Sequence, residues 1–173
     1  MYLLAFAVAK GANLQTTTPA THISTTVDND GFWTVTTPRG AIKTKRLVFA
    51  SNAYTAGISP QYAQKIIPTR SICSHIVTPP GKSVPVLTNT YSIRIGPGQY
   101  NYLIPRPDGS IIVGGAEVIP NAQSSNREHW YNVTDDSTLI EPVKNYFDGF
   151  MQRTFRGWED SGAVTDMVWT GSE

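Results

Sequence analysis

Three histidines and one cysteine are the side chains of this 173-residue sequence best suited to acid–base, nucleophilic or metal chemistry. His22, His75 and His129 are scattered along the chain at no spacing typical of a metal site. Histidine titrates near neutral pH, so each is a candidate for proton transfer, although a surface or hydrogen-bonded core position is its commoner role. Cys73 stands in a predicted strand, where a free thiol usually behaves as a small buried hydrophobic residue. None of the four marks an active site by itself.

A second group of chemically useful side chains belongs to neighbouring predicted strands. Arg94 lies in the stretch 91–95, Tyr102 lies in 100–104, and Arg106 follows shortly after. A guanidinium group pairs with carboxylates in a bidentate fashion, so these residues are candidates for binding an anionic substrate. An ordinary half-exposed sheet face carries the same residue types, and the spacing alone favours that alternative.

The glycine-rich segments are typical of turns. Neither Gly96-Pro97-Gly98 nor Gly114-Gly115 opens a predicted helix, so neither builds a phosphate-binding strand–turn–helix unit. The sequence also lacks a Gly-x-Ser-x-Gly elbow, a Walker loop and a His-Glu-x-x-His motif. The residues alone leave two hypotheses open. The chain is part of an enzyme whose cofactor is held mainly by other segments, or it is a free-standing β-sheet binding module.

Composition narrows the class of protein. Fourteen Lys and Arg residues against 13 Asp and Glu residues give a net charge of +1, with no basic stripe for nucleic acid. A single cysteine excludes an internal disulfide framework and a multi-cysteine zinc site. The apolar stretch 2–9 is far shorter than the roughly 20 residues that span a bilayer. We therefore expect a globular protein of an intracellular compartment, cytoplasmic or peroxisomal, with neither nucleic acid nor membrane as its partner.

The first part of the sequence predicts a short helix followed by β-structure. Residues 2–9 read as the end of a helix, and Gly11 suits the left-handed position after it. The continuous apolar run 47–50 predicts a strand covered on both faces, as in a parallel sheet. Stretches rich in Thr, Ile, Val and aromatic residues predict further strands over 13–18, 22–27, 32–36 and 41–44.

The second part predicts an antiparallel sheet with one long helix. The helix begins at Asp135 or Asp136 and runs to about Phe155, because apolar residues recur there at helical spacing. A glycine turn is expected near Gly171. The predicted class is α+β with the sheet predominant, and its strands cover 66–77, 91–95, 100–104, 110–114 and 163–169.

Several short segments, taken together and in order, resemble the FAD-dependent oxidoreductases of the D-amino-acid-oxidase type, and in particular its fungal members. Each segment alone is modest, but together they cover essentially the whole chain. They are Gly-Ala-Asn-Leu-Gln-Thr at 11–16, Thr-Pro-Ala at 18–20, Trp-Thr-Val-Thr-Thr-Pro-Arg-Gly at 33–40, Leu-Val-Phe-Ala-Ser-Asn-Ala-Tyr at 47–54, Ile-Pro-Thr-Arg at 67–70, Tyr-Leu-Ile-Pro-Arg-Pro-Asp-Gly-Ser at 102–110, Ile-Val-Gly-Gly at 112–115 and Trp-Thr-Gly at 169–171.

The resemblance implies a flavoenzyme of two interleaved domains. It assigns 1–60 to a partial Rossmann-type FAD-binding domain, 61–160 to an antiparallel-sheet substrate domain, and 161–173 to the start of a return to the FAD-binding domain. It implies oxidation of the C–N bond of an amine or amino acid by hydride transfer to flavin, with oxygen as the usual acceptor. The family's Gly-x-Gly-x-x-Gly fingerprint does not occur in this sequence. We therefore expect an internal fragment of the enzyme, inactive alone and weak in FAD binding.

The resemblance also implies roles for individual residues. Arg94, Tyr102 and Arg106 fall on the substrate-domain sheet and are expected to contact a small amine or amino acid; no metal ligand and no catalytic residue is assigned. Ser51 replaces the family's threonine. A non-catalytic module or degenerate paralogue is the alternative, and the oligomeric state stays open. The residues expected to contact FAD are Pro19, Ala20, Ala50, Ser51, Asn52, Trp169 and Gly171.

Overall fold

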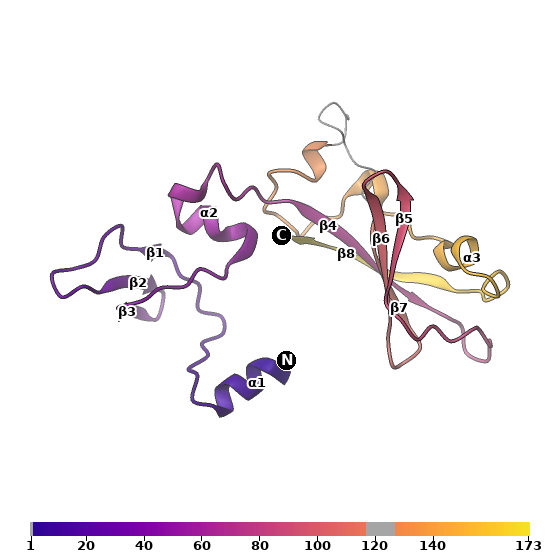
Figure 1. Cartoon of the computed structure of the whole chain (residues 1–173), viewed down its shortest axis with the longest axis horizontal. Helices are drawn as coiled ribbons and strands as arrows, with labels where there is room; N and C mark the ends of the chain where they lie inside the picture. The colour runs from indigo at the N-terminus through magenta and orange to yellow at the C-terminus, as the bar shows by residue number, and fades with distance from the viewer. Residues whose placement is uncertain (1, 117–126) are drawn as a thin grey trace. The chain divides into compact units, whose positions relative to one another are not determined.

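The computed structural model describes residues 2–116 and 127–173 (Figure 1). The chain divides into two compact units, residues 1–65 and 66–173. Each contains its own antiparallel sheet, of three strands in the first unit and five in the second. The mixture of helices with antiparallel sheets agrees with the predicted class.

The first unit begins with helix α1 (Tyr2–Ala9) and continues into a small β-meander. Gly11 follows the helix with a φ of 97°, the left-handed conformation expected for its position. Strands β1 (His22–Ile23), β2 (Trp33–Thr37) and β3 (Gly40–Thr44) pair in sequence order. The turn before β2 is closed by Asp28, whose carboxylate accepts hydrogen bonds from two backbone amides.

Two strand predictions in this unit are wrong. Residues 13–18 form no strand, and only His22–Ile23 of the stretch 22–27 does. The apolar run 47–50 is also irregular, and Val48 is 85% exposed. A strand covered on both faces needs neighbouring strands and a second layer, and the described residues of this unit supply neither for 47–50. The buried strand of a Rossmann sheet is therefore not formed here.

After this run the chain turns through three short helices: η1 (Asn52–Tyr54), α2 (Thr55–Ile58) and η2 (Pro60–Tyr62). Asn52 begins the change of direction with a φ of 47°, a left-handed conformation that asparagine tolerates better than most residues. The hydroxyls of Ser51 and Thr55 lie 2.9 Å apart and hold the bend.

The second unit is built on a five-stranded antiparallel sheet with strand order β5-β6-β7-β4-β8. Turns at 96–98 and 107–109 join β5 to β6 and β6 to β7, as predicted. Figure 1 shows these strands with helix α3 beside them. The strands are β4 (Arg70–Val77), β5 (Tyr91–Gly96), β6 (Gln99–Pro105), β7 (Ile111–Gly115) and β8 (Val164–Ser172).

One face of this sheet carries the core. Alternate residues of β4, Arg70, Ile72, Ser74 and Ile76, are buried on it. Residues 127–163 cover the face with η3 (Arg127–His129), η4 (Glu141–Val143) and α3 (Phe150–Thr154). The apolar core comprises Ile72, Ile76, Leu103, Ile111, Val113, Ala116, Trp130, Ile140, Phe147, Phe150, Met151, Trp158 and Ala163.

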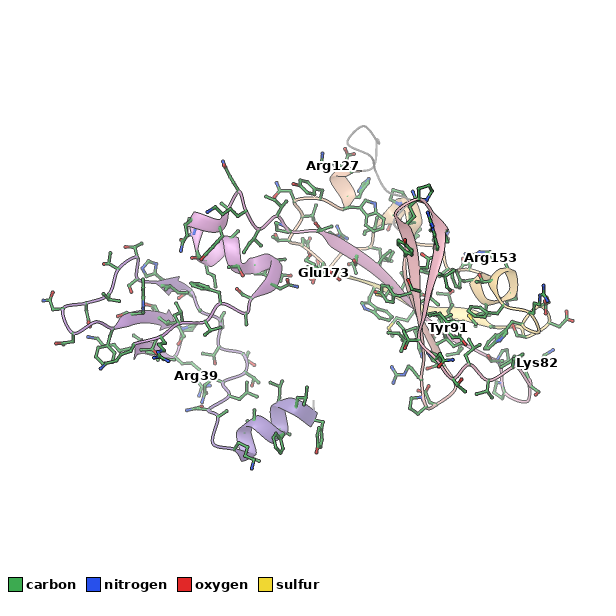
Figure 2. The ribbon with its side chains drawn as sticks, in the orientation of Figure 1. Arg39, Lys82, Tyr91, Arg127, Arg153 and Glu173 are labelled. Atoms are coloured by element: carbon green, nitrogen blue, oxygen red, sulfur yellow. The ribbon has the colours of Figure 1, made fainter. Side chains whose placement is uncertain are left out.

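The long helix predicted over 135–155 is wrong. Asp135 does not cap a helix but accepts hydrogen bonds from the amide and hydroxyl of Ser137, which closes a local turn. Gly149 then adopts a φ of 65°, so the regular helix begins only at Phe150. The apolar residues that recur at helical spacing over 135–155 are still partly buried, because turns present them to the sheet. Arg153, labelled in Figure 2, lies over the Phe150 ring at 5.1 Å.

The glycine turn predicted near Gly171 is also wrong. Gly171 lies inside β8 opposite Ser71, and β8 continues to Ser172. Backbone hydrogen bonds of 2.8 and 3.0 Å between Thr69 and Glu173 extend the pairing beyond the strand ends. Figure 2 labels Glu173 at this end of the sheet. Residues 164–173 therefore belong to the sheet of the second unit.

Candidate functional site

The candidate site is the second face of the five-stranded sheet, opposite the core; we call it the open face. One row of register partners crosses all five strands on this face: Ser92, Tyr102, Gly114, Cys73 and Trp169. Tyr102 is 38% and Trp169 is 37% exposed. Successive residues of a strand point to opposite faces, which explains why Leu103 and Ile72 are buried beside the partly exposed Tyr102 and Cys73, while Gly114 in this row is covered by the Tyr102 ring.

The centre of this row is a contact between a phenol and a thiol. The Tyr102 hydroxyl oxygen lies 2.8 Å from Sγ of Cys73. The two residues are not adjacent in the sheet, since Gly114 separates them on β7, and the Tyr102 ring lies directly over that glycine. A Cβ atom at position 114 would stand 2.1 Å from Cζ of Tyr102. Glycine is therefore required for the ring to reach the thiol.

The Cys73 thiol is protonated at neutral pH. Burial raises its pKa, and the negative charge of Glu173 raises it further, while the hydrogen bond with Tyr102 opposes both effects. The thiolate is the nucleophilic form of cysteine, so this environment does not activate the group. Cys73 is half-buried on the open face rather than packed in the core, which corrects the prediction from its position in a strand.

A second row lies beside the first and contains Ile104, Ile112, His75 and Met167. Nδ1 of His75 lies 2.7 Å from a carboxylate oxygen of Asp166. His75 follows Cys73 by two residues on β4, so the imidazole and the thiol point to the same face. The open face thus combines aromatic and apolar surface with one histidine–carboxylate pair.

The predicted substrate residues fall in two places. Arg94 lies on the open face as the register partner of Tyr100, and its Nε donates to the Gly96 carbonyl at 3.3 Å. Arg106 lies beyond the end of β6, in the turn to β7, with its Nε 3.5 Å from the Asp108 carboxylate. The structure therefore places Arg94 and Tyr102 on one face and Arg106 at its edge.

Sequence reasoning did not select His75 or Asp166 as a pair. Side-chain direction alternates along a strand, so the predicted strand 66–77 was enough to place Ser71, Cys73 and His75 on the same face. No sequence signal connects His75 to Asp166, because 91 positions separate them and their contact depends on the pairing of β4 with β8.

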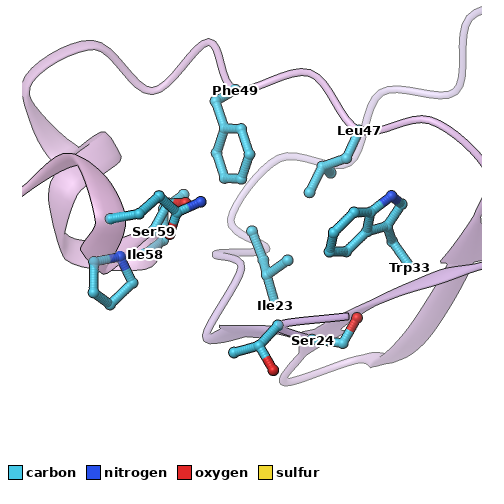
Figure 3. Close-up of a pocket in the computed structure, with 10 residues that line it drawn as sticks. Ile23, Ser24, Trp33, Leu47, Phe49, Ile58 and Ser59 are labelled. Atoms are coloured by element: carbon cyan, nitrogen blue, oxygen red, sulfur yellow. The ribbon is translucent and has the colours of Figure 1, made fainter. Parts of the chain in front are cut away.

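The first unit holds a mainly apolar cavity of about 250 Å³. Figure 3 shows Ile23, Trp33, Leu47 and Phe49 directed toward it from the meander and from the irregular run. Its other lining residues come from 24–25 and from 58–61.

The predicted cofactor contacts fall into three segments. Pro19 and Ala20 lie one residue before β1, which carries Ile23 of the cavity, and Ala50, Ser51 and Asn52 directly follow Phe49. The segments 18–20 and 50–52 therefore flank strands or runs that line this cavity. Trp169 and Gly171 belong to β8 in the second unit.

Comparison with known proteins identifies the family. The model of the family described as "DAO: FAD dependent oxidoreductase" matches residues 1–172. The chain belongs to this family. No curated protein matches the sequence. Among solved structures, glycine oxidase from Geobacillus kaustophilus is similar in fold, with a TM-score of 0.65 at 19% sequence identity. The match covers 99% of this chain but 40% of the glycine oxidase chain, so this chain spans less than half the length of that relative.

The cavity of the first unit can be compared with FAD, the cofactor of the family. Pockets for drug-sized ligands measure roughly 300–1,000 Å³, so a cavity of about 250 Å³ has room for one ring system of FAD and not for the whole dinucleotide. The walls of this cavity are mainly apolar, which suits a planar ring of the cofactor.

The phosphates of FAD find less support in the described residues of the first unit. The guanidinium of Arg39 donates to the side chain of Gln15 at 2.8 Å, and the ammonium group of Lys43 pairs with Asp28 at 2.8 Å. Both cations already have partners in the fold. The sequence also lacks the Gly-x-Gly-x-x-Gly loop that holds a pyrophosphate, so the described part of this unit fits a ring of FAD better than its phosphates.

Two further features of the described residues bear on the class of site. Among residues 2–116 and 127–173, no three His, Cys, Asp or Glu side chains stand close enough to hold a metal ion. None of the helices in these two ranges has the length and apolar character needed to cross a bilayer.

Proposed function

We propose that the open face is the substrate-facing wall of an FAD-dependent oxidoreductase that oxidises the C–N bond of an amine or amino acid, with oxygen as the final acceptor. Membership of the DAO family supports the redox class. The observation that carries the proposal is the row from Ser92 to Trp169, a polar and aromatic stripe that crosses all five strands opposite the core. Side chains held on paired strands keep their positions better than those on loops, as a reaction wall requires.

FAD, when bound, supplies the two-electron oxidation by accepting hydride from the carbon next to nitrogen. The residues of this chain bind and orient the substrate. The phenol of Tyr102 is the polar contact at the centre of the row, and its ring and the Trp169 indole provide apolar surface that excludes water. Arg94, on the same face, is available to pair with a substrate carboxylate if the substrate is an amino acid.

We propose binding roles for residues of each unit. We assign cofactor contacts to Pro19, Ala20 and 50–52 in the first unit, and to Trp169 and Gly171 in β8. The five-stranded sheet would carry substrate recognition.

The chain spans 40% of the glycine oxidase chain, so the proposal includes a longer gene product of which this chain is a part, and the test uses that product loaded with FAD. Under anaerobic conditions, a panel of primary, secondary and amino-acid amines should bleach the visible flavin band, and admission of air should restore it with formation of hydrogen peroxide. Failure of every amine to bleach the flavin would reject the proposed function.

The role of Tyr102 is tested by removing one atom. Tyr102→Phe keeps the ring over Gly114 and deletes the hydroxyl, so we expect a rise of about tenfold in the KM for the amine, in line with the loss of roughly one hydrogen bond. Tyr131→Phe is the matched control, since Tyr131 is 40% exposed but lies outside the open-face strands, at an isolated bridge with Thr69. Equal effects of the two substitutions would contradict the assignment of Tyr102.

The 173-residue chain alone provides a separate measurement. We expect it to retain FAD weakly, because the Gly-x-Gly-x-x-Gly fingerprint that holds the pyrophosphate does not occur in the sequence. Equilibrium dialysis with FAD checks this expectation, and a tight complex of one FAD per chain would overturn it.

A further inference from the structure

The pair formed by His75 and Asp166 has a specific structural origin. The register between β4 and β8 shifts at this point: His75 is the partner of Met167, whereas the next residue, Ile76, is the partner of Thr165. Asp166 is therefore an extra residue in β8, which makes the irregularity a β-bulge. In a regular strand, Asp166 would point to the face opposite Met167, into the side that carries the core. The bulge instead brings its carboxylate to the imidazole.

This geometry determines which nitrogen of His75 is free for chemistry. The carboxylate of Asp166 lies 2.7 Å from Nδ1, so in the neutral imidazole the proton resides on Nδ1 and is donated to Asp166. The lone pair is then on Nε2. Nothing in the described structure donates a hydrogen bond to Nε2, and the His75 side chain is 24% exposed. A carboxylate that orients a histidine in this way is a recurring arrangement for proton transfer.

The charges around His75 are mainly negative. Asp166 faces it from β8, and Asp108, in the turn between β6 and β7, is close enough to sense its charge. Arg106 is the nearby cation on that turn, but it is paired with Asp108 at 3.5 Å. On β4 itself, Cys73 is a neutral thiol. Carboxylates close to a half-buried histidine favour a cationic ligand over an anionic one.

We propose that His75 accepts the proton of the substrate ammonium group through Nε2, with Asp166 as its positioning residue, so that the ligand of this end of the open face is a protonated amine. The proposal rests on the proposed function and deepens it. In the step, one N–H bond of the ammonium breaks and its electron pair stays on nitrogen, while a bond forms between the proton and Nε2. The neutral amine that results has the lone pair needed for loss of hydride from the neighbouring carbon, and the imidazolium is stabilised by Asp166.

The kinetic test measures the rate of flavin reduction by a saturating amine in the full-length, FAD-loaded protein. His75→Gln should lower this rate about 100-fold at neutral pH, the lower end of what general bases contribute. It should also abolish the fall of the rate toward acid pH, because that fall reflects protonation of the imidazole. Asp166→Asn should lower the rate less and preserve the acid fall. His22→Gln is the matched control, because His22 is an exposed residue of β1.

A second experiment applies NMR spectroscopy to the 173-residue chain and does not require enzymatic activity. Nitrogen-15 shifts of the His75 ring should show the proton on Nδ1 in the wild type, and a mixed population in Asp166→Asn. Added benzylamine should shift the Nε2 resonance of His75 and leave that of His22 unchanged. A wild-type tautomer with the proton on Nε2 would overturn the proposal.

The results distinguish failure of the proton-transfer step from failure of the proposed function. If the wild type reduces flavin and His75→Gln does so with the same rate and pH profile, the proton step is rejected and the proposed function stands. If the wild type reduces no flavin with any amine, the proposed function is rejected and the proton step is rejected with it. A loss confined to His75→Gln and, in part, to Asp166→Asn supports both.

Discussion

The hydroxyl oxygen of Tyr102 lies 2.8 Å from the sulfur of Cys73, and the tyrosine ring passes over Gly114 to make this contact. Three strands, β6, β7 and β4, are thereby tied together on the open face as well as through their backbones. The contact fixes the tyrosine in one orientation, with its phenol over the centre of the sheet. The chemistry proposed for the open face depends on this fixed orientation.

Gly114→Ala should break the contact. The new methyl group would stand 2.1 Å from the tyrosine ring, so the ring must swing away and the thiol loses its partner. We expect a loss of unfolding free energy of about 1–3 kcal/mol, typical of overpacking. Urea unfolding measures this loss, and the reaction of the chain's single cysteine with a maleimide reports the exposed thiol.

The matched control for this substitution is Gly171→Ala on β8. A Cβ at position 171 meets nothing within 4 Å, and the backbone there is ordinary strand. Its unfolding free energy should therefore stay the same or rise slightly. Equal destabilisation by the two alanines would show that the Tyr102 ring does not constrain position 114.

The thiol of Cys73 should react slowly in the folded chain. Burial raises its pKa, so at a pH near 8 a smaller fraction is thiolate than in an exposed cysteine. Alkylation by iodoacetamide, followed by mass spectrometry between about pH 7 and 10, should accelerate with pH over a higher range than in the same chain unfolded in urea. Identical profiles in the folded and unfolded chains would contradict the burial of this group.

The sequence predicted the strands of the second unit because their signals are local. Alternation of apolar and polar residues defined 91–95 and 100–104, and glycine–proline turns separated them. The helix predicted over 135–155 failed for a physical reason. Apolar residues at helical spacing were also compatible with a chain of turns that packs on a sheet, and Gly149 interrupts any regular helix there.

The candidate site was only partly predictable. Arg94 and Tyr102 could be placed on neighbouring strands joined by a glycine–proline turn, but their common face follows from the register between β5 and β6. The thiol–phenol contact depends on which strand lies next to β7, and the contact of His75 with Asp166 depends on a bulge in the pairing of β4 with β8. Strand order and register are set by packing across the whole unit, and the sequence carries no local signal for either.

Asn101 should be among the most sensitive positions of the second unit. It is fully buried, donates to the Tyr146 hydroxyl at 2.8 Å and accepts from the Ala116 amide at 2.9 Å. Asn101→Leu leaves the buried Ala116 amide and the hydroxyl of the half-buried Tyr146 without this hydrogen-bond partner, so we expect a loss of about 3 kcal/mol in unfolding free energy. Tyr146→Phe removes one of the two bonds and should cost about 1 kcal/mol. A leucine variant as stable as the wild type would show that this network does not hold β6 to the helical cover.

Low pH should lower the stability of the first unit, because protonation of Asp28 removes its ion pair with Lys43. The hydrogen bond and ion pair with Lys43, together with the amide of Phe32, hold the pKa of Asp28 below its ordinary value of 3.8. A carboxylate with a lowered pKa in the folded state contributes stability above its unfolded pKa, and this contribution disappears as the pH falls through the folded pKa. Thermal unfolding between about pH 5 and 2 should therefore show a decline in the melting temperature. That decline should be smaller in Asp28→Asn and in Lys43→Met, because neither variant has the ion pair to lose. Parallel decline in all three proteins would place the origin of the acid sensitivity elsewhere in the chain.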